Sequence, residues 1–175
     1  MNKILKAGIL LIILAIPAFV FIFLHGFGEN RFEIPVYYQD GIDTTFASCD
    51  WETPHIVNID GFAGKTTVVG FGKEQLKDLN RLGVDYEQEG TFQTFAFTSE
   101  ESDSNRYYNS LIFKQTGDLS SLLACSFVVN ESTISEYPLI LVDTEQRIRG
   151  YYYISDVEEF ERLIHELNII FENLK

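Results

Sequence analysis

Cysteine and positive charge are scarce in this chain of 175 residues. Its two cysteines, Cys49 and Cys125, are too few for a disulfide scaffold and match no CxxC spacing, so they permit at most one bridge. Lysine and arginine total 13 residues against 26 aspartates and glutamates, which gives a formal net charge of −13. So acidic a chain repels phosphate backbones, and we predict that it binds no nucleic acid.

Motifs of common enzymes are missing as well. The chain contains no GxSxG nucleophile elbow, no GxxxxGKS/T phosphate loop and no GxGxxG dinucleotide motif. Ligand-type side chains cluster only at Cys49, Asp50, Glu52 and His55, whose spacing matches no established metal signature, so we favour a solvated loop there over a metal site. We therefore predict no catalytic, cofactor-binding or metal-binding residues and no enzyme activity.

Apolar residues, in contrast, are plentiful. Hydrophobic residues make up 46% of the chain and aromatic residues 14%, which is ample for a packed core and argues against disorder. The length suits one domain of ordinary size plus the hydrophobic segment at the start of the chain.

That hydrophobic segment is an uncharged run over residues 7–24, AGILLIILAIPAFVFIFL. At about 1.5 Å rise per residue, a helix of this length spans ~27 Å, close to the hydrocarbon thickness of a bilayer. A cleaved signal peptide has a shorter apolar region and a small-x-small site, which only Gly26 and Gly28 resemble, so we favour a retained transmembrane helix. Lys3 and Lys6 precede the run, and the positive-inside rule then predicts a single-pass protein of a bacterial inner membrane with its C-terminal domain in the periplasm or exterior.

We divide the chain into a membrane anchor over residues 1–28, an extended arm over 29–54 and a domain over 55–175. The arm mixes aromatic residues with turn residues and shows no helical period. Without the two lysines before the anchor, the chain has 11 basic against 26 acidic residues, a net charge of −15.

The domain begins with the pattern of a strand, a helix and a second strand. Residues 66–71 form an apolar run typical of a buried strand, and a short strand from residue 55 leads into it. Leucines spaced three apart predict a helix over residues 73–82, with Gly83 at its C-cap. Residues 91–98 alternate aromatic and polar side chains, as a strand does.

The sequence of the second half of the domain predicts two helices and a strand hairpin. We expect helices from near Asn105 and over residues 118–124. Residues 137–142 form a buried strand, and residues 147–153 its antiparallel partner after a turn.

A closing helix over residues 155–174 is the clearest element. Ser155 and Glu158 form a capping box, and apolar residues repeat at three and four to make one face: Val157, Phe160, Ile164, Leu167, Phe171 and Leu174. A βαβ unit followed by ββα is the thioredoxin-like arrangement. We therefore predict an α/β fold, a thioredoxin-like mixed sheet with flanking helices, preceded by one N-terminal transmembrane helix.

The hairpin resembles that of a known family. LVDTEQRIRGYY, residues 141–152, is similar to the hairpin of SCO/SenC-type proteins, approximately L-V-D-x-x-G-x-I-R-G-Y-Y. These are membrane-anchored, thioredoxin-like copper chaperones and thiol reductases that serve cytochrome oxidase assembly. The segments RFEIPVYYQDG at 31–41 and GKTTVVGF at 64–71, together with the closing helix, also resemble the family. The resemblance implies a role near a membrane respiratory complex.

The chemistry of that family does not carry over to this sequence. In the family, a CxxxC pair after the first core strand and a histidine just before the hairpin hold copper. Here GKEQL at residues 72–76 contains no cysteine, and residues 132–138 contain no histidine. Tyr153 also replaces the acidic residue usual after the tyrosines. The resemblance therefore implies a degenerate member without thiol exchange or a soft copper site at those positions.

Two functions remain open. The first is a non-catalytic, membrane-anchored protein that binds a protein partner, in assembly of a membrane respiratory complex or as its accessory subunit. Tyr151, Tyr152 and Tyr153 are its candidate contact surface, although strand propensity also explains them. The second is a thiol redox or copper chaperone protein that uses Cys49 and Cys125, which could pair in an oxidising compartment. We favour Cys125, in LLACSF, as a buried small apolar residue instead.

Overall fold

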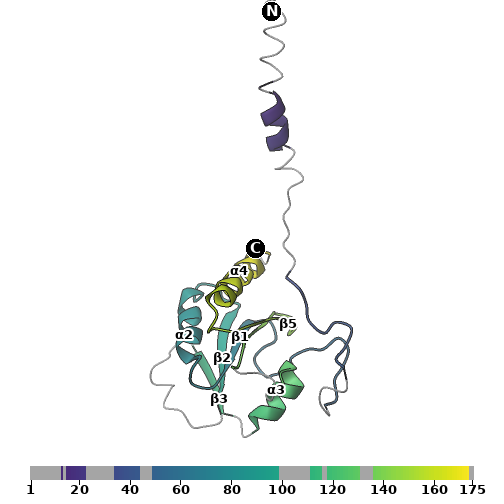
Figure 1. Cartoon of the computed structure of the whole chain (residues 1–175), viewed down its shortest axis with the longest axis vertical. Helices are drawn as coiled ribbons and strands as arrows, with labels where there is room; N and C mark the ends of the chain where they lie inside the picture. Colours follow the sequence, from purple (N-terminus) through teal and green to yellow (C-terminus); the bar gives the residue numbers. More distant parts are fainter. Residues whose placement is uncertain are drawn as a thin grey trace, which may run out of the picture. The chain divides into compact units, whose positions relative to one another are not determined.

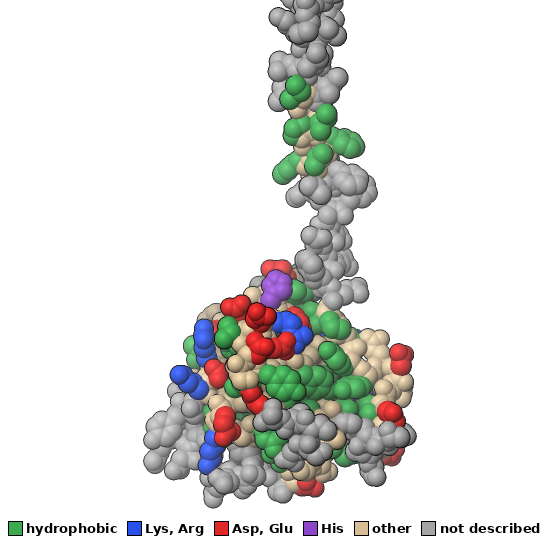
Figure 2. Space-filling view, viewed as in Figure 1, with side chains coloured by type: hydrophobic (Ala, Val, Ile, Leu, Met, Phe, Trp, Pro, Cys, Tyr) green, Lys and Arg blue, Asp and Glu red, His purple; other side chains and the backbone are tan. Residues whose placement is uncertain are grey.

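The computed structural model describes residues 13, 15–22, 34–43, 49–98, 111–115, 118–130 and 136–173. The chain divides into two compact units, Met1–Glu33 and Ile34–Lys175, so most of the predicted arm belongs to the second unit. In the first unit, residues 13 and 15–22 are helical and expose apolar side chains (Figure 2). No helix within the described part of the chain is long and apolar enough to cross a membrane. The rest of the predicted transmembrane helix over residues 7–24 lies outside the described residues.

A five-stranded mixed sheet forms the centre of the second unit (Figure 1). Its strands are β1 (Thr66–Phe71), β2 (Phe92–Thr98), β3 (Leu111–Gln115), β4 (Leu139–Val142) and β5 (Ile148–Tyr152), in the spatial order β3-β2-β1-β4-β5. The first three strands are parallel to one another. β4 is antiparallel to β1, and β5 is antiparallel to β4.

β1 and β4 are the most deeply buried strands. The sequence of β1, TTVVGF, is rich in β-branched residues, which favour strands, and all six of its residues are buried. The four residues of β4, LILV, are buried as well. Because both faces of these strands are covered, their sequences are continuous apolar runs rather than alternating ones. The predicted strands at 66–71, at 91–98 and in the hairpin are confirmed within a few residues.

Helices cover both faces of the sheet (Figure 1). α2 (Leu76–Asp85) and α4 (Val157–Asn173) pack on one face, where their leucines join a core that includes Val68 of β1. α3 (Leu119–Phe127) packs on the other face together with the irregular segment 57–62, in a second core that includes Val69 of β1. Val68 and Val69 point to opposite faces, since successive side chains of a strand alternate.

Asp143 closes the β4–β5 hairpin with a buried carboxylate that is fully paired. Its Oδ1 accepts hydrogen bonds from the backbone N–H groups of Glu145 and Arg147, both at 2.9 Å. Its Oδ2 accepts from the guanidinium groups of Arg147 and Arg149, at 2.8 and 3.1 Å. Arg149 also donates to the backbone oxygen of Ile34 and so fastens the start of the second unit to β5. The aspartate and the two arginines of this hairpin sequence therefore have structural roles.

Gly150 in β5 leaves room for the ring of Tyr152. A Cβ atom at Gly150 would lie 2.2 Å from the phenol oxygen of Tyr152. That oxygen donates to Oε2 of Glu166 at 2.6 Å, and the guanidinium carbon of Arg162 lies 4.7 Å from the centre of the ring. Tyr152 thus joins β5 to α4. Its burial, and secondly its hydrogen bond to Glu166, raise its pKa well above the usual value.

Three predictions for the domain before α3 fail or fall outside the described residues. The first helix continues past Gly83 to Asp85, because the ring of Tyr86 packs against Phe92 and so holds the last turn in place. The short strand expected from residue 55 does not form, and the edge strand β3 was not predicted. The helix expected from near Asn105 lies outside the described residues.

The cap of the closing helix also differs from the prediction. The N–H of Glu158 donates to Oδ1 of Asp156 at 2.9 Å, so Asp156 caps the helix. Ser155 donates its own N–H to the side chain of Glu136 at 3.2 Å. The capping box predicted for Ser155 and Glu158 is therefore wrong.

The buried face of α4 is shifted relative to the predicted one. Val157 is 69% exposed, whereas Leu163, which the prediction left out, is fully buried beside Leu167 and Phe171. Phe160 and Ile164 are half-buried at the edge of the same core. Leu174 lies outside the described residues.

The order of elements confirms the thioredoxin-like part of the predicted fold. β1, α2 and β2 form a parallel βαβ unit, and β4, β5 and α4 follow as an antiparallel hairpin and a closing helix. β3 extends the sheet at the edge beside β2. The second unit is therefore a thioredoxin-like mixed sheet with helices on both faces.

Candidate functional site

The turn from β1 into α2 is where the resembled family carries its CxxxC pair. In this chain that turn contains no cysteine, and its Gln75, the N-cap residue of α2, is only 2% exposed. Its Oε1 accepts a hydrogen bond from the N–H of Phe71 at 2.7 Å, and its Nε2 donates to the backbone oxygen of Tyr137, just before β4. Gln75 therefore links the end of β1 to the start of β4 through a neutral, unreactive amide.

Close packing leaves no free space behind Gln75. A Cβ atom added at Gly70 would lie 2.7 Å from Oε1 of Gln75 and 2.6 Å from Cδ1 of Leu79. The amide is thus held between a strand and a helix, where it has neither a nucleophile nor a titratable group to offer. The sequence shows only that the turn lacks cysteine; no local pattern marks Gln75 as its buried, doubly bonded residue.

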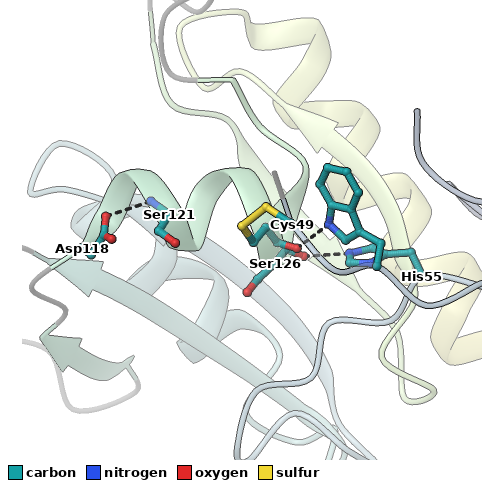
Figure 3. The surroundings of a disulfide bond; sticks show 7 residues. Cys49, His55, Asp118, Ser121 and Ser126 are labelled. Carbon is teal, nitrogen blue, oxygen red and sulfur yellow. Dashed lines mark hydrogen bonds between the residues drawn. A yellow bond between two sulfur atoms is a disulfide. The ribbon is translucent and has the colours of Figure 1, made fainter. Parts of the chain in front are cut away.

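Cys49 and Cys125 form a disulfide, with their Cα atoms 5.6 Å apart (Figure 3). The bridge joins the irregular segment before residue 58 to α3 across 76 positions of sequence. Both residues are partly exposed, so the interpretation of Cys125 as a buried apolar residue is wrong. Because the chain has two cysteines, it has no free thiol.

The helix that carries Cys125 is capped at its start. Oδ1 of Asp118 accepts a hydrogen bond from the N–H of Ser121 at 2.9 Å, as Figure 3 shows. The helix then runs to Phe127 rather than to residue 124 as predicted. It ends at Val128, which adopts a left-handed conformation with φ +55°.

Side chains distant in sequence bind the last carbonyl groups of α3, which have no partners within the helix. Trp51 donates its indole N–H to the oxygen of Cys125 at 2.9 Å, and Nε2 of His55 lies 3.0 Å from the oxygen of Ser126 (Figure 3). A carbonyl can only accept, so Nε2 of His55 carries the proton. The hydroxyl of Tyr151 donates to the oxygen of Phe127 at 2.8 Å.

A pocket of about 250 Å³ lies between segment 50–58 and the last turn of α3. The disulfide and the bonds from Trp51 and His55 hold its two sides together. Its lining residues are Asp50, Trp51, Glu52, His55, Ile56, Asn58, Cys125 and Ser126.

The surroundings of the disulfide disfavour a thiolate. Reactive cysteines lie near cationic side chains or at the N-terminal end of a helix, both of which stabilise the negative sulfur. Cys125 instead lies near the C-terminal end of α3, where the helix dipole is negative, and shares its pocket with the carboxylates of Asp50 and Glu52. Among the described residues, no lysine or arginine lines this pocket. This environment suits a stable bridge better than an exchanging one.

The residues of the cluster at 49–55 line or adjoin one pocket but have different roles. Cys49 is committed to the disulfide, and His55 is buried rather than solvated, with Nε2 occupied by Ser126. The solvated-loop interpretation is therefore wrong for His55. Among the described residues, no group of three or more His, Cys, Asp or Glu side chains is arranged to hold a metal ion.

The three consecutive tyrosines have three different environments. Tyr152 is fully buried, so it cannot contact a partner. Tyr151 is half-buried and bonded to Phe127 and to the hydroxyl of Tyr38, and burial is the largest cause that raises its pKa. Tyr153 is 37% exposed. Of the three tyrosines proposed as a contact surface, only Tyr153 is exposed enough to contact a partner.

Comparisons with known proteins identify no family for this chain. No family model matches the chain, and no curated protein matches it. Similar solved structures include a thiol-disulfide oxidoreductase from Bacteroides fragilis (13% identity, TM-score 0.45, 63% of this chain and 86% of that one). The thioredoxin domain of a thiol-disulfide oxidoreductase from Bacteroides vulgatus (15%, 0.42, 62% and 83%) and Mycobacterium tuberculosis AhpC (17%, 0.42, 62% and 72%) are others. The fold assignment rests on the strand order and connections described above.

Proposed function

We propose that this chain is a non-catalytic, membrane-anchored thioredoxin-like protein that acts by binding another protein. Its setting is a membrane respiratory complex, which it helps to assemble or joins as an accessory subunit. The similarity of residues 141–152 to the SCO/SenC hairpin supports that setting.

The observation that carries the proposal is the buried amide of Gln75. It lies in the turn between β1 and α2, which contains no cysteine although the resembled family carries its thiols after the same strand, and its two hydrogen bonds tie β1 to the segment before β4. Thiol exchange needs a thiolate that can reach a partner's sulfur. The amide of Gln75 contains no sulfur, and at 2% exposure a partner's sulfur cannot reach it.

The disulfide acts as a structural cross-link within this fold. It closes a loop of 76 positions, for which loop-closure entropy gives a stabilisation of about 4 kcal/mol. It fastens an irregular segment that forms part of the core beside α3. Disulfides persist in oxidising compartments, so this bridge supports a location of the domain outside the cytoplasm. The uncharged run at residues 7–24 supports the anchor.

A second candidate function is thiol redox or copper chemistry at Cys49 and Cys125. The observation that favours it is that Cys125 lines a pocket and that both cysteines are partly exposed. A reductant could therefore approach the bridge from solvent.

Two assays on the full chain in a nonionic detergent separate these functions. Dithiothreitol-driven reduction of insulin should proceed at the uncatalysed rate, and the chain treated with dithiothreitol should retain no more Cu(I) at neutral pH than the Cys49→Ser/Cys125→Ser variant. Turnover above background that the variant loses, or stoichiometric Cu(I), would establish the second function.

The membrane and partner parts of the proposal need their own test. The protein should stay with membranes after alkaline carbonate washing and keep its first 25 residues. Purification of the native protein in mild detergent should recover subunits of a membrane complex. A soluble species with a new N-terminus near Glu29 would contradict the anchor.

A further inference from the structure

The pocket beside the disulfide has the charge of a site for a cation. Asp50 and Glu52 contribute carboxylates, and none of the other lining residues in the described part of the chain is a lysine or an arginine. The last turn of α3 carries no basic residue, so no side chain of that turn offsets the negative end of its dipole. Carboxylates and a helix C-terminus act in the same direction, and a positive group in the pocket is favoured by both.

The size and lining of the pocket restrict the ligand further. A volume of about 250 Å³ lies below the roughly 300–1,000 Å³ of most small-molecule sites, and it suits a single side chain. Trp51 offers an indole ring, the aromatic group on which lysine and arginine cations bind best. Asn58 adds a neutral amide. A bare metal ion lacks ligands, since no three suitable side chains converge within the described residues.

The walls of the pocket are fixed before any ligand arrives. The disulfide joins them covalently, and the hydrogen bonds from Trp51 and His55 fasten segment 50–58 to the end of α3. A preformed site loses little conformational entropy on binding. The chain as a whole carries a net charge of −13, which attracts a positively charged partner over a longer distance.

We propose that this pocket binds a basic side chain, of arginine or lysine, that a protein partner presents. The inference rests on the proposed function and names the chemistry of its partner. The charged head of the partner's side chain lies between the carboxylates of Asp50 and Glu52, with its stem along the indole of Trp51. The pocket is thus the point at which an acidic domain recognises a basic segment.

The chain has a built-in reporter for this site, because Trp51 is its only tryptophan. We would titrate the full chain, in nonionic detergent with its disulfide intact, with N-acetyl-arginine methylamide and follow Trp51 fluorescence. The neutral isostere N-acetyl-citrulline methylamide is the matched ligand control. We expect saturation by the arginine compound with a Kd on the order of 1 mM, and at least tenfold weaker binding of the citrulline compound.

Variants then test the two carboxylates. Asp50→Asn/Glu52→Gln should weaken binding of the arginine compound at least tenfold. The control Glu158→Gln/Glu161→Gln removes the same charge from exposed positions on α4 and should leave the Kd within twofold. Equal binding of arginine and citrulline compounds, or equal Kd values for the two double variants, would overturn the inference. If this test fails while the chain remains inactive with insulin and Cu(I), the inferred binding site is contradicted and the proposed non-catalytic function is not.

Discussion

The two faces of the sheet are closed in different ways. On one face, the regular helices α2 and α4 bury leucines against the strands and need no covalent link. On the other, the nine-residue helix α3 and the irregular segment 57–62 cover the core, and the disulfide together with bonds from Trp51, His55 and Tyr151 to the end of α3 holds them. Regular helices are held mainly by burial of an apolar face, whereas an irregular segment depends more on specific links. We call the face covered by α3 and segment 57–62 the linked face, and the candidate pocket lies there.

Removal of the disulfide should be the largest single loss on the linked face. We expect the Cys49→Ser/Cys125→Ser variant to lose about 4 kcal/mol of unfolding free energy, because its unfolded state regains the entropy of a 76-position loop. Urea unfolding of the full chain in detergent, followed by Trp51 fluorescence, measures the loss. A loss below about 1 kcal/mol would mean that the hydrogen bonds alone hold this face.

Truncation of a buried side chain of α4 tests whether burial of leucines holds the other face of the sheet. Leu167→Ala should cost about 3 kcal/mol, because it removes a fully buried side chain and leaves a cavity between α4 and the sheet. Glu161→Ala, on the exposed side of the same helix, should change the unfolding free energy by less than about 0.5 kcal/mol. Similar losses for the two variants in urea unfolding would show that α4 is not docked on the sheet.

Gln75 should matter for stability rather than for chemistry. Gln75→Ala leaves the N–H of Phe71 and the oxygen of Tyr137 without their partner, which should cost about 2 kcal/mol. The exposed neighbour provides the control, and Glu74→Ala should be nearly neutral. Hydrogen exchange at the N–H of Phe71 should accelerate only in the Gln75 variant. Unchanged exchange there would contradict the bond.

The last expected effect, absent at neutral pH, is a loss of stability at alkaline pH. Burial raises the pKa of Tyr151 and Tyr152 above the usual value near 10, so both remain protonated in the folded chain while they ionise in the unfolded chain. Stability is therefore complete below pH 10 and falls above it, by about 1.4 kcal/mol per pH unit for each tyrosine. Tyr151→Phe should reduce the slope of unfolding free energy against pH above 10. An unchanged slope would contradict the burial of its hydroxyl.

The sequence predicted the parts of the fold that depend on local patterns. The apolar runs of β1 and β4 and the alternation in β2 indicated strands, and the order of elements indicated a thioredoxin-like sheet. The strand β3 was not predicted, because its sequence, LIFKQ, is short and shows no clear alternation of apolar and polar residues. The cap of α4 was misplaced because Ser155 and Asp156 both suit an N-cap, and a bond to Glu136 engages the backbone of Ser155.

The site depends on contacts that no local pattern encodes. Gln75 gains its role from Tyr137, which is 62 positions away, and Trp51 gains its role from Cys125, which is 74 positions away. The disulfide could be named only as a candidate, because the distance between two cysteines depends on the folded chain. A usable signal existed in Trp51, a lone tryptophan between two acidic residues near a cysteine.

The reduction potential of the Cys49–Cys125 bridge tests the structural role of the disulfide most directly. The full chain would be equilibrated in glutathione buffers of graded ratio, and the fraction of alkylated cysteine measured by mass spectrometry. A cross-link that holds an acidic, irregular face together should have a potential below about −300 mV, with reduction accompanied by loss of folded structure. A potential between about −120 and −270 mV, with the fold retained in the reduced form, would instead identify the pair as a working thiol-disulfide couple.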